Sequence, residues 1–290
     1  MRALASVLCA LALTGNAQAG GYTAYTLPQG ENWYSSWAEG INSSGNIVGA
    51  ANVIVRYDSF NSPVVETRAV AWSGGAFQYL TPLPDATYSI AHGISDTGIV
   101  VGESQYIASN GRNYTYAATW QSGIVRSLGN LGLDNNYSSA YGINAGGIVV
   151  GIGSDSTGTH PVIFRGTGPV AVYLSGATPF GGNALFDVNN GGIAAGYSTV
   201  HSNGTDYNVA ITGDTSSLAF SVLPSLEGGT HTAALRINDA GNVVGFSYLM
   251  DQLPHATYWS SGQVTQLDLG LNATSSSATA IINLAIKYKC

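Results

Sequence analysis

The sequence predicts an all-β protein, a β-propeller of four-stranded blades with five complete repeats and an incomplete sixth that the N-terminal strand closes or partly closes. Two observations predict this fold. One nonapeptide pattern recurs five times, with starts 53, 49, 45 and 49 residues apart. The residues between its copies form short apolar stretches separated by Gly-containing turns. Four strands in roughly 45 residues is the period of a propeller blade.

Composition favours the same class. Of the 290 residues, 38 are Gly and 17 are Tyr, and 9% are charged, against roughly 25% in an ordinary soluble domain. Such a chain is typical of secreted all-β proteins and is poor material for long surface helices. The net charge of −7, with Lys and Arg scattered singly, excludes the basic footprint that nucleic-acid binding needs.

Residues 1–19 have the pattern of a secretory signal peptide. Arg2 precedes an apolar run that ends at Leu13, and Ala17-Gln18-Ala19 stands before Gly20. We expect cleavage near Ala19 and a secreted, extracellular mature chain. No segment reaches the roughly 20 apolar residues that cross a bilayer, which predicts no transmembrane segment. Cys9 leaves with the signal peptide and Cys290 remains alone, so no internal disulfide is expected.

The nonapeptide is an apolar residue, Asn or Ser, two free positions, Gly, one free position, two small apolar residues and Gly. Its copies are INSSGNIVG from Ile41, ISDTGIVVG from Ile94, INAGGIVVG from Ile143, VNNGGIAAG from Val188 and INDAGNVVG from Ile237. Side chains of Asn, Asp and Ser bond nearby amides, and Gly accepts a positive φ, so this pattern predicts a tight hairpin turn. We interpret the Asn residues at 42, 144, 189 and 238, and Asp96, as turn residues, because a calcium loop needs several converging carboxylates.

A looser pattern follows each copy: a stretch ending in an aromatic residue, a turn, and a short strand ending in Leu. The aromatic residues are Trp72, Trp120, Phe164 and Trp259, and Thr212 takes that place in the fourth unit. Each unit therefore has strand a before the turn Asn, strand b after it, strand c ending at the aromatic residue, and strand d. We expect the aromatic rings to pack between blades, where burying one removes about 150–250 Å² from water and contributes roughly 4–6 kcal/mol.

The predicted single domain spans 20–290. Its parts are a closing strand 22–30, units 34–83, 87–131, 137–177, 182–226 and 231–270, and a partial unit 276–290. Tyr22–Leu27 resembles the end of a strand d and is expected to complete the last blade. Ile282-Asn283, 45 residues after Ile237-Asn238, restarts strand a. Two alternatives remain for the end: 284–288 pairs beside 22–27, or the ring stays open with an exposed sheet edge. Truncation of the chain is a separate hypothesis for the incomplete sixth unit.

The repeat resembles the extracellular repeat of the HAF family, named for a His-Ala-Phe tripeptide before the aromatic position. His255-Ala256-Thr257-Tyr258-Trp259 matches it best, His160-Pro161-Val162-Ile163-Phe164 less well, and Ala38 to Asn42 and Ala140 to Asn144 carry the upstream pattern. The similarity covers nearly all of residues 22–283. The resemblance implies a secreted bacterial propeller-like protein without an established activity.

Strand order places the b–c and d–a loops on one face, where binding residues usually lie on a rigid scaffold. The predicted b–c loops are 51–66, 103–115, 153–159, 197–208 and 246–254, and the d–a loops include 31–37, 85–89 and 134–138. Rigid aromatic side chains beside Ser, Asn and Gly are typical of a recognition surface. The candidate ligand-binding residues are Trp33, Tyr34, Trp37, Tyr57, Tyr88, Tyr106, Tyr114, Tyr137, Tyr197, Tyr207 and Tyr248. The expected partner is an extracellular glycan or a surface protein; a bare structural scaffold is the alternative.

A second candidate site concerns one free position of strand a. It holds Glu39, His92, Tyr141, Phe186 and Leu235 in successive units. If this position faces the central channel, the first three residues form a polar sector there. If it points between blades, they are packing residues.

The sequence predicts no catalytic centre, no metal site and no cofactor. A glycosidase needs two carboxylates about 5–9.5 Å apart, and nothing selects a pair among Glu31, Glu39, Asp58, Asp85, Glu103 and Asp134. His92, His160, His201, His231 and His255 lack metal-ligand spacing, and no GxSxG elbow follows a strand. A non-catalytic binding protein is therefore favoured over its rival, a propeller enzyme that acts on polysaccharides.

Overall fold

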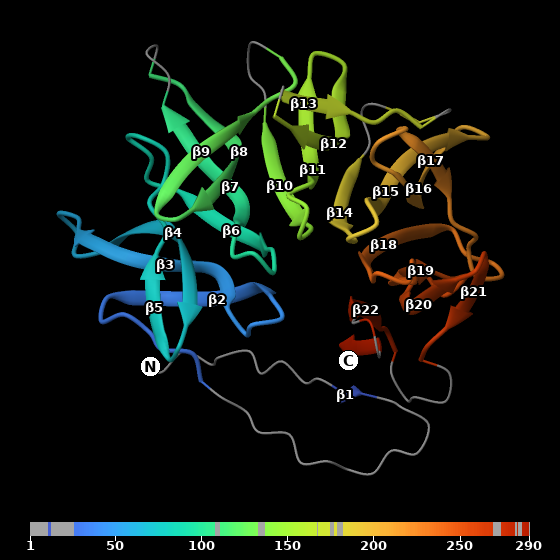
Figure 1. The fold of residues 1–290 in the computed structure, drawn as a ribbon, viewed down its shortest axis with the longest axis horizontal. Helices are drawn as coiled ribbons and strands as arrows, with labels where there is room; N and C mark the ends of the chain where they lie inside the picture. The colour runs from blue at the N-terminus through green and yellow to red at the C-terminus, as the bar shows by residue number, and fades with distance from the viewer. Residues whose placement is uncertain are drawn as a thin grey trace. The chain divides into compact units, whose positions relative to one another are not determined.

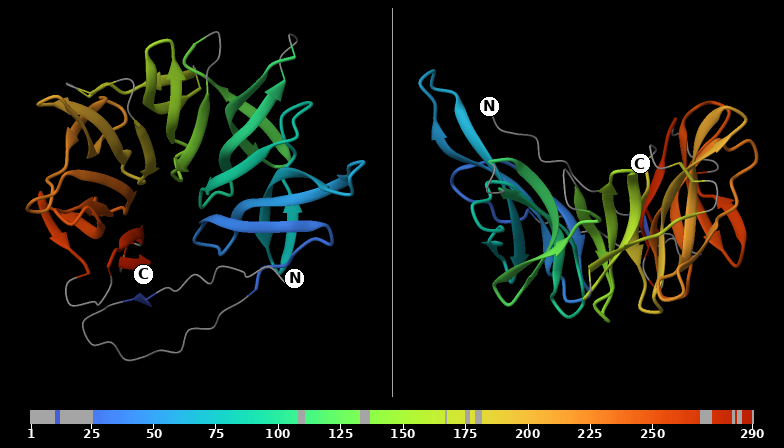
Figure 2. Two further views of the ribbon diagram at one scale, coloured as in Figure 1. Left: turned by 180° about the vertical axis from the view of Figure 1, so that it is seen from behind. Right: turned by 90° about the horizontal axis from the view of Figure 1, so that it is seen from above.

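The computed structural model describes residues 11–12, 26–107, 111–132, 137–166, 168–174, 177–178, 182–268, 274–281, 283 and 286–289. Across these residues the regular elements are all strands, and none is a helix able to cross a membrane. They form five four-stranded sheets, each in chain order (Figures 1 and 2), and one three-stranded sheet. The four-stranded sheets are the predicted blades a-b-c-d, so the fold class, a β-propeller of four-stranded blades, is confirmed.

Strands a to d of the five sheets have the following bounds. The sheets are β2 (Trp33–Ile41), β3 (Ile47–Tyr57), β4 (Pro63–Ser73) and β5 (Ala76–Tyr79); β6 (Ser89–Ile94), β7 (Val100–Ile107), β8 (Asn113–Gln121) and β9 (Ile124–Gly129); β10 (Ser138–Ile143), β11 (Val149–Asp155), β12 (Gly158–Arg165) and β13 (Gly168–Ala171); β14 (Ala184–Val188), β15 (Ile193–Ser202), β16 (Thr205–Asp214) and β17 (Ala219–Val222); and β18 (His231–Ile237), β19 (Val243–Tyr248), β20 (Pro254–Ser260) and β21 (Gln263–Gln266).

The chain divides into two compact units. The N-terminal unit consists of residues 22–156 and 164–170, and the C-terminal unit of residues 1–21, 157–163 and 171–290. The first contains the sheets β2–β5 and β6–β9, and the second contains β14–β17 and β18–β21. The packing below is described within each unit.

The a–b turns are held by the side chain of the repeated Asn. Oδ1 of Asn42 accepts a hydrogen bond from the Asn46 amide at 2.9 Å, and Asn144, Asn189 and Asn238 act alike. The second repeat has Ser95 at this position, and its hydroxyl accepts a hydrogen bond from the Ile99 amide instead. The Gly that follows has a φ of 78° at Gly45 and 83° at Gly98, a region costly for other residues. The predicted turn role of these residues is confirmed.

Strand a carries a β-bulge at the same place in all five sheets. The register shifts between Ala38 and Gly40 in β2, and between Ala91 and Gly93 in β6. The bulged positions are Glu39, His92, Tyr141, Phe186 and Leu235. The bulge bends strand a over strand b, so a Cβ at Gly102 would lie 2.0 Å from the Ile90 carbonyl oxygen. This contact explains why the nonapeptide ends in Gly.

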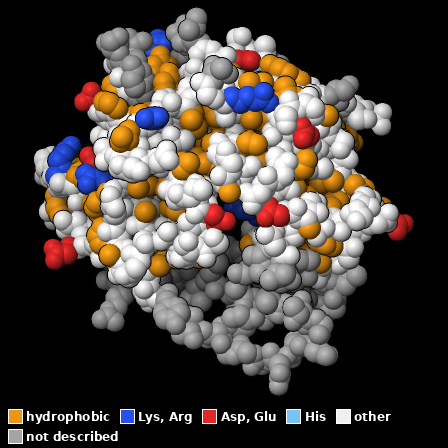
Figure 3. All heavy atoms as spheres, in the orientation of Figure 1, with side chains coloured by type: hydrophobic (Ala, Val, Ile, Leu, Met, Phe, Trp, Pro, Cys, Tyr) orange, Lys and Arg blue, Asp and Glu red, His pale blue; other side chains and the backbone are white. Residues whose placement is uncertain are grey.

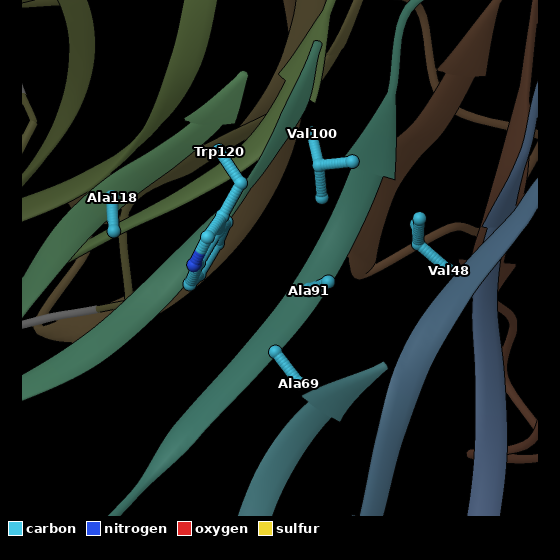
Figure 4. Close-up of a cluster of buried hydrophobic side chains, with 6 residues drawn as sticks. All are labelled: Val48, Ala69, Ala91, Val100, Ala118 and Trp120. Atoms are coloured by element: carbon cyan, nitrogen blue, oxygen red, sulfur yellow. The ribbon is translucent and has the colours of Figure 1, made fainter. Parts of the chain in front are cut away.

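The aromatic residues of strand c pack against the preceding sheet. Trp120 lies in a cluster with Val48 and Ala69 of that sheet (Figure 4), and Leu80, at the end of its strand d, packs on the cluster. Nε1 of Trp120 donates to the Thr81 carbonyl at 2.6 Å. Trp259 and Pro224 repeat this contact at 2.6 Å. The predicted packing between blades is therefore confirmed for these rings.

Leu27 and Pro28 repeat the same contact for the first sheet. Leu27 packs on the cluster that contains Trp72, and Nε1 of Trp72 donates a hydrogen bond to the Pro28 carbonyl at 2.9 Å. Leu27 therefore packs on Trp72 in the way that Leu80 packs on Trp120. This agrees with the prediction that Leu27 resembles the end of a strand d. The rest of the proposed closing strand, 22–25, lies outside the described residues.

The final sheet has the order β1–β23–β22. Strand β22 (Ser277–Ile281) pairs with β23 (Ile286–Lys289), which also pairs with β1 (Leu11–Ala12). The described strand beside β23 therefore lies inside the predicted signal peptide and not at 22–27. Removal of that peptide would leave β22 and β23.

In the fourth sheet the aromatic place belongs to Gly213 and not to the predicted Thr212. Val100 pairs with Trp120 in the second sheet, and the matching residue Ala194 pairs with Gly213. Phe220 of strand d pairs with Gly213 and fills the space above it, where a Cβ would lie 2.5 Å from the Phe220 ring. Without an aromatic residue at this place in strand c, the sequence had nothing to mark the register.

The b–c connections are shorter than predicted because strands b and c continue as paired hairpins. The β3–β4 ladder runs on to Tyr57 and Pro63, and Asp58 closes the short turn by accepting the amides of Phe60 and Ser62. The β15–β16 ladder likewise continues to Ser202 and Thr205. Much of each predicted b–c loop is therefore strand.

A hydroxyl at the start of strand a joins a sheet to the one before it at four sheet contacts. Oγ of Ser89 accepts a hydrogen bond from the Ala69 amide at 3.0 Å, and Oγ of Ser138 accepts one from the Ala117 amide at 2.9 Å. The matching pairs in the C-terminal unit are Thr232 with Ala210 at 2.7 Å and Ser276 with Ala256 at 2.9 Å. Without these hydroxyls, strand-c amides would be left unpaired between packed sheets.

The hydroxyl contact also corrects the register of the last repeat. Ser276 occupies the place of Thr232, which lies seven residues before Asp239. The Asp239 amide donates to Oδ1 of Asn283 at 2.8 Å, as the Asn190 amide donates to Asp239 at 2.9 Å. Asn283 therefore matches Asp239, one residue away from the predicted match with Asn238.

We expect Ser138→Ala to lower the free energy of unfolding by about 1–3 kcal/mol, because it leaves the buried Ala117 amide without an acceptor. Ser62→Ala, at an exposed turn, is the control and should change the stability by less than about 0.5 kcal/mol. Urea unfolding of both variants measures the difference. Equal effects would contradict a linking role for the hydroxyl.

Candidate functional site

The N-terminal unit contains a buried carboxylate, Glu103, in the middle of a sheet contact. Glu103 lies on β7, and its side chain is 7% exposed. The matching strand-b position carries Ala50, Ile152, Tyr197 and Phe246 in the other sheets. A charge stands here where the other repeats place apolar or aromatic side chains, so its surroundings must stabilise it.

Two tyrosines bind the Glu103 carboxylate, one oxygen each. The Tyr88 hydroxyl donates to Oε1 at 2.6 Å, and the Tyr137 hydroxyl donates to Oε2 at 2.8 Å. Tyr88 directly precedes β6, and Tyr137 directly precedes β10, so the two come from successive sheets. Glu103 therefore links two strand-a segments through charge-assisted hydrogen bonds.

The imidazole of His92 completes this cluster. Its Nε2 lies 3.9 Å from Oε2 of Glu103, and its ring centroid lies 5.1 Å from that of Tyr141, edge to face. His92 and Tyr141 are the bulged residues of β6 and β10, and the bulge directs both toward one another. Nε2 of His92 and Oγ of the buried Ser139 make no hydrogen bond among the described residues.

This environment keeps Glu103 ionised. Burial by itself raises the pKa of Glu103, but the polar groups of His92, Tyr88 and Ser139 favour the charged form more strongly, and the pKa falls to about 2. Burial and the neighbouring Glu103 charge raise the pKa of Tyr88 and of Tyr137 above the ordinary value. At neutral pH the cluster is therefore a fixed carboxylate surrounded by protonated tyrosines.

A groove adjoins the cluster at the b–c and d–a end of the sheets. It has a volume of about 280 Å³ and is lined by residues 66–68, 79–82 and 86–89. We call it the Arg68 groove. Tyr88 belongs to both features, since it lines the groove while its hydroxyl binds Glu103. The groove lies at the end of the sheets where binding was predicted.

One ion pair gives the Arg68 groove its charge. Nη2 of Arg68 lies 2.7 Å from Oε2 of Glu66, and Nε of Arg68 donates to the same oxygen at 3.1 Å. The Arg68 guanidinium also lies 5.5 Å from the centre of the Tyr79 ring. The pair is partly exposed, at 38% for Arg68 and 26% for Glu66. Charged side chains, drawn blue and red, are few on the face shown in Figure 3.

Sequence reasoning missed Arg68, Glu66 and Tyr79. The spacing could have pointed to Arg68, because Arg68 lies four residues before Trp72, just as His255 lies four residues before Trp259. Alternation along β4 also places Glu66 and Arg68 on one face of the strand. Glu66 had been assigned to the end of a loop, although it is paired with Val53 in the β3–β4 ladder.

The predicted ligand-binding residues do not gather at one place. Tyr88 and Tyr137 meet at Glu103, whereas Trp33 packs in the aromatic cluster of Trp72 and Tyr79. The others are distributed as follows: Tyr34 and Tyr57 are 61% and 58% exposed, Trp37 is half-buried in β2, Tyr114 stacks on Tyr116, Tyr197 stacks on Phe186, and Tyr207 and Tyr248 flank His231. The side chain of Tyr106 lies outside the described residues.

The predicted polar sector of Glu39, His92 and Tyr141 is divided. His92 and Tyr141 are in contact, but Glu39 is exposed on β2, and no hydrogen bond or ion pair joins it to either of them in the described part of the chain. Nε2 of His92 instead lies 3.9 Å from Oε2 of Glu103.

The candidate carboxylates lie in different surroundings. Glu31, Glu39, Asp58 and Asp85 are exposed, and Glu103 is buried; Asp134 lies outside the described residues. The described residues contain no group of three His, Cys, Asp or Glu side chains that could hold a metal ion.

His255, the residue of the HAF resemblance, is fully engaged. Its Nδ1 lies 2.9 Å from Oδ2 of Asp268 and its Nε2 lies 3.0 Å from Oδ2 of Asp251. Burial lowers the pKa of His255, but the two carboxylates outweigh it and hold the pKa above the ordinary value. His255 therefore fastens the Asp251 turn to the end of its sheet.

Comparison with known proteins supports the fold alone. No family model and no curated protein matches the sequence. Among solved structures, a putative TolB from Agrobacterium tumefaciens superposes with a TM-score of 0.50 at 12% identity, covering 80% of each chain. A puromycin-hydrolysing peptidase from Mycobacterium tuberculosis gives 0.50 at 12% identity over 82% of this chain, and an acylaminoacyl peptidase from Pyrococcus horikoshii gives 0.52 at 12% over 84%. The chain spans 39% of the length of either peptidase.

We expect Glu103 to contribute roughly 3 kcal/mol of stability that depends on pH. Its pKa is lowered in the folded chain, so this contribution is present above the unfolded-state pKa near 4.5 and is lost as the pH falls toward about 2. Urea unfolding at pH 6 and pH 2.5 should show a smaller loss on acidification for Glu103→Gln than for the wild type. Glu31→Gln, at an exposed site, should behave as the wild type; if Glu103→Gln also does, the assigned charge state is wrong.

Proposed function

We propose that this protein is a secreted, non-catalytic recognition protein that binds an extracellular glycan in the Arg68 groove. The observation that carries the proposal is the Arg68–Glu66 pair held against the Tyr79 ring in a groove of about 280 Å³. A planar cation and a carboxylate can hydrogen-bond neighbouring sugar hydroxyls. Tyr and Trp rings supply apolar area at low conformational cost.

The Glu103 cluster supports binding over hydrolysis. A general acid or base works best with a pKa near the operating pH, whereas the pKa of Glu103 is about 2. Both of its oxygens are already bound by Tyr88 and Tyr137. In our proposal Glu103 therefore acts as a positioning residue that fixes Tyr88 in the wall of the groove.

The extracellular setting is part of the proposal. It rests on the signal-peptide pattern of residues 1–19, the low content of charged residues and the resemblance to the HAF repeat. A charge-poor surface leaves few sites for ionic binding, so neutral polar ligands are favoured over nucleic acids.

Binding of residues 20–290 to an array of extracellular glycans tests the groove. We expect selective binding that Arg68→Ala weakens at least tenfold, because it removes hydrogen bonds from a charged donor. Arg56→Ala removes an exposed Arg from β3 of the same sheet and should leave binding unchanged. A well-folded chain that binds no glycan would overturn the proposal and favour a scaffold role.

Export is tested separately. Expression in a bacterium with a secretory pathway should release a chain that begins at Gly20, as intact mass measurement of the culture medium shows. Replacing Ala17 and Ala19 by Leu should block cleavage, because the site requires small residues. An intracellular chain that retains Met1 would count against secretion.

A further inference from the structure

The Arg68 groove has a counterpart in the C-terminal unit. His160 lies four residues before Phe164, as Arg68 lies four residues before Trp72. The ladder gives the same match, since the Val172 amide donates to the Pro161 carbonyl and the Leu80 amide donates to the Ala69 carbonyl. His160 and Arg68 therefore occupy one repeat position at the b–c end of strand c.

A second groove of about 160 Å³ opens at this position. It is lined by Thr157, His160, residues 172–174, residues 177–178, Asn183 and Ser198. These residues all belong to the C-terminal unit, and most come from the segments that also line the Arg68 groove: the start of strand c, the end of strand d and described residues between strand d and the next strand a. Ser198 of strand b has no counterpart in the Arg68 groove. We call it the His160 groove.

Tyr173 gives the His160 groove an exposed aromatic surface. Its side chain is 69% exposed, the largest exposure among the described tyrosines given above. Its ring centroid lies 5.1 Å from that of the buried His160, at an interplanar angle of 58°. The His160 ring supports one side of Tyr173 and leaves the rest of it open to solvent.

The polar groups of the His160 groove are fixed. Nε2 of His160 lies 3.0 Å from the Thr157 hydroxyl. Asn183 is 2% exposed; its amide donates to the carbonyls of Thr159 and Thr178, and its Oδ1 accepts from Ser198 at 2.6 Å. The Tyr173 ring beside the exposed Thr157 hydroxyl, without a carboxylate or a guanidinium in the lining, suits a neutral sugar. Asn183 makes its hydrogen bonds within the protein and holds the wall of the groove in place.

We infer that the His160 groove is a second carbohydrate site that takes one neutral sugar residue, stacked on Tyr173. The inference rests on the proposed function, because the ligand class is carried over from the Arg68 groove. The His160 groove is smaller, at about 160 Å³ against about 280 Å³, and has no Arg or carboxylate in its lining. We therefore expect the two grooves to bind different sugars.

The test is titration of residues 20–290 with the methyl glycosides of glucose, galactose, mannose and N-acetylglucosamine, followed by calorimetry and by saturation-transfer NMR. We expect Arg68→Ala to retain a site for one of these sugars, and the added Tyr173→Ala to weaken that site at least fivefold. Tyr57→Ala, a change of equal size at a tyrosine that is 58% exposed and lines neither groove, is the matched control.

The outcomes separate the two proposals. If Arg68→Ala abolishes all sugar binding while the wild type binds, the His160 groove is overturned and the Arg68 groove stands. If Tyr173→Ala alone removes the binding and Arg68→Ala has no effect, the second site is supported and the proposed function of the Arg68 groove fails. If the two Tyr variants weaken binding equally, stacking on Tyr173 is wrong. Because Tyr173 is exposed, unfolding is not expected, and circular dichroism verifies this.

Discussion

The hydrogen bond from a strand-c amide to a hydroxyl at the start of the next strand a is the contact on which the rest of the arrangement depends. An amide buried between two sheets without an acceptor costs about 1–3 kcal/mol. Ser89, Ser138, Thr232 and Ser276 remove that cost at four sheet contacts. Because a hydroxyl reaches only about 3 Å, it also fixes the stagger of each sheet on its neighbour.

The other contacts follow from this stagger. It places the Leu that ends one strand d against the Trp of the next sheet, and a free carbonyl within reach of the indole. At the opposite end it brings two of the turn Asn residues to the next turn: Nδ2 of Asn42 donates to the Ser95 carbonyl, and Nδ2 of Asn189 donates to the Asn238 carbonyl. A chain with 9% charged residues is held together by such neutral hydrogen bonds and by apolar packing.

The sequence was sufficient for the blades, the turns and most of the aromatic packing, because each depends on a residue type that few others replace. Gly102 is required because strand a approaches it closely. Asn42 is required because its side chain accepts the hydrogen bond from a turn amide. The predicted register was wrong by one residue at Gly213 and at Asn283, where the sequence has no such characteristic residue. The linking hydroxyl was not recognised as a motif, because Ser, Thr and Asn alternate at its position and each is common in loops.

The candidate site was only partly visible for a related reason. Glu103 becomes conspicuous once the strand-b positions are aligned and one charge appears among Ala50, Ile152 and Phe246. Its importance, however, depends on Tyr88 and Tyr137, which reach it from successive sheets. Since both oxygens of Glu103 are occupied, the cluster has little capacity left for a ligand, but it restricts Tyr88, which lines the Arg68 groove. A groove whose wall is held by a buried, ionised carboxylate loses little side-chain entropy on binding. In the proposed recognition function, the rigid cluster therefore fixes the geometry of the groove wall, and the open groove contacts the ligand.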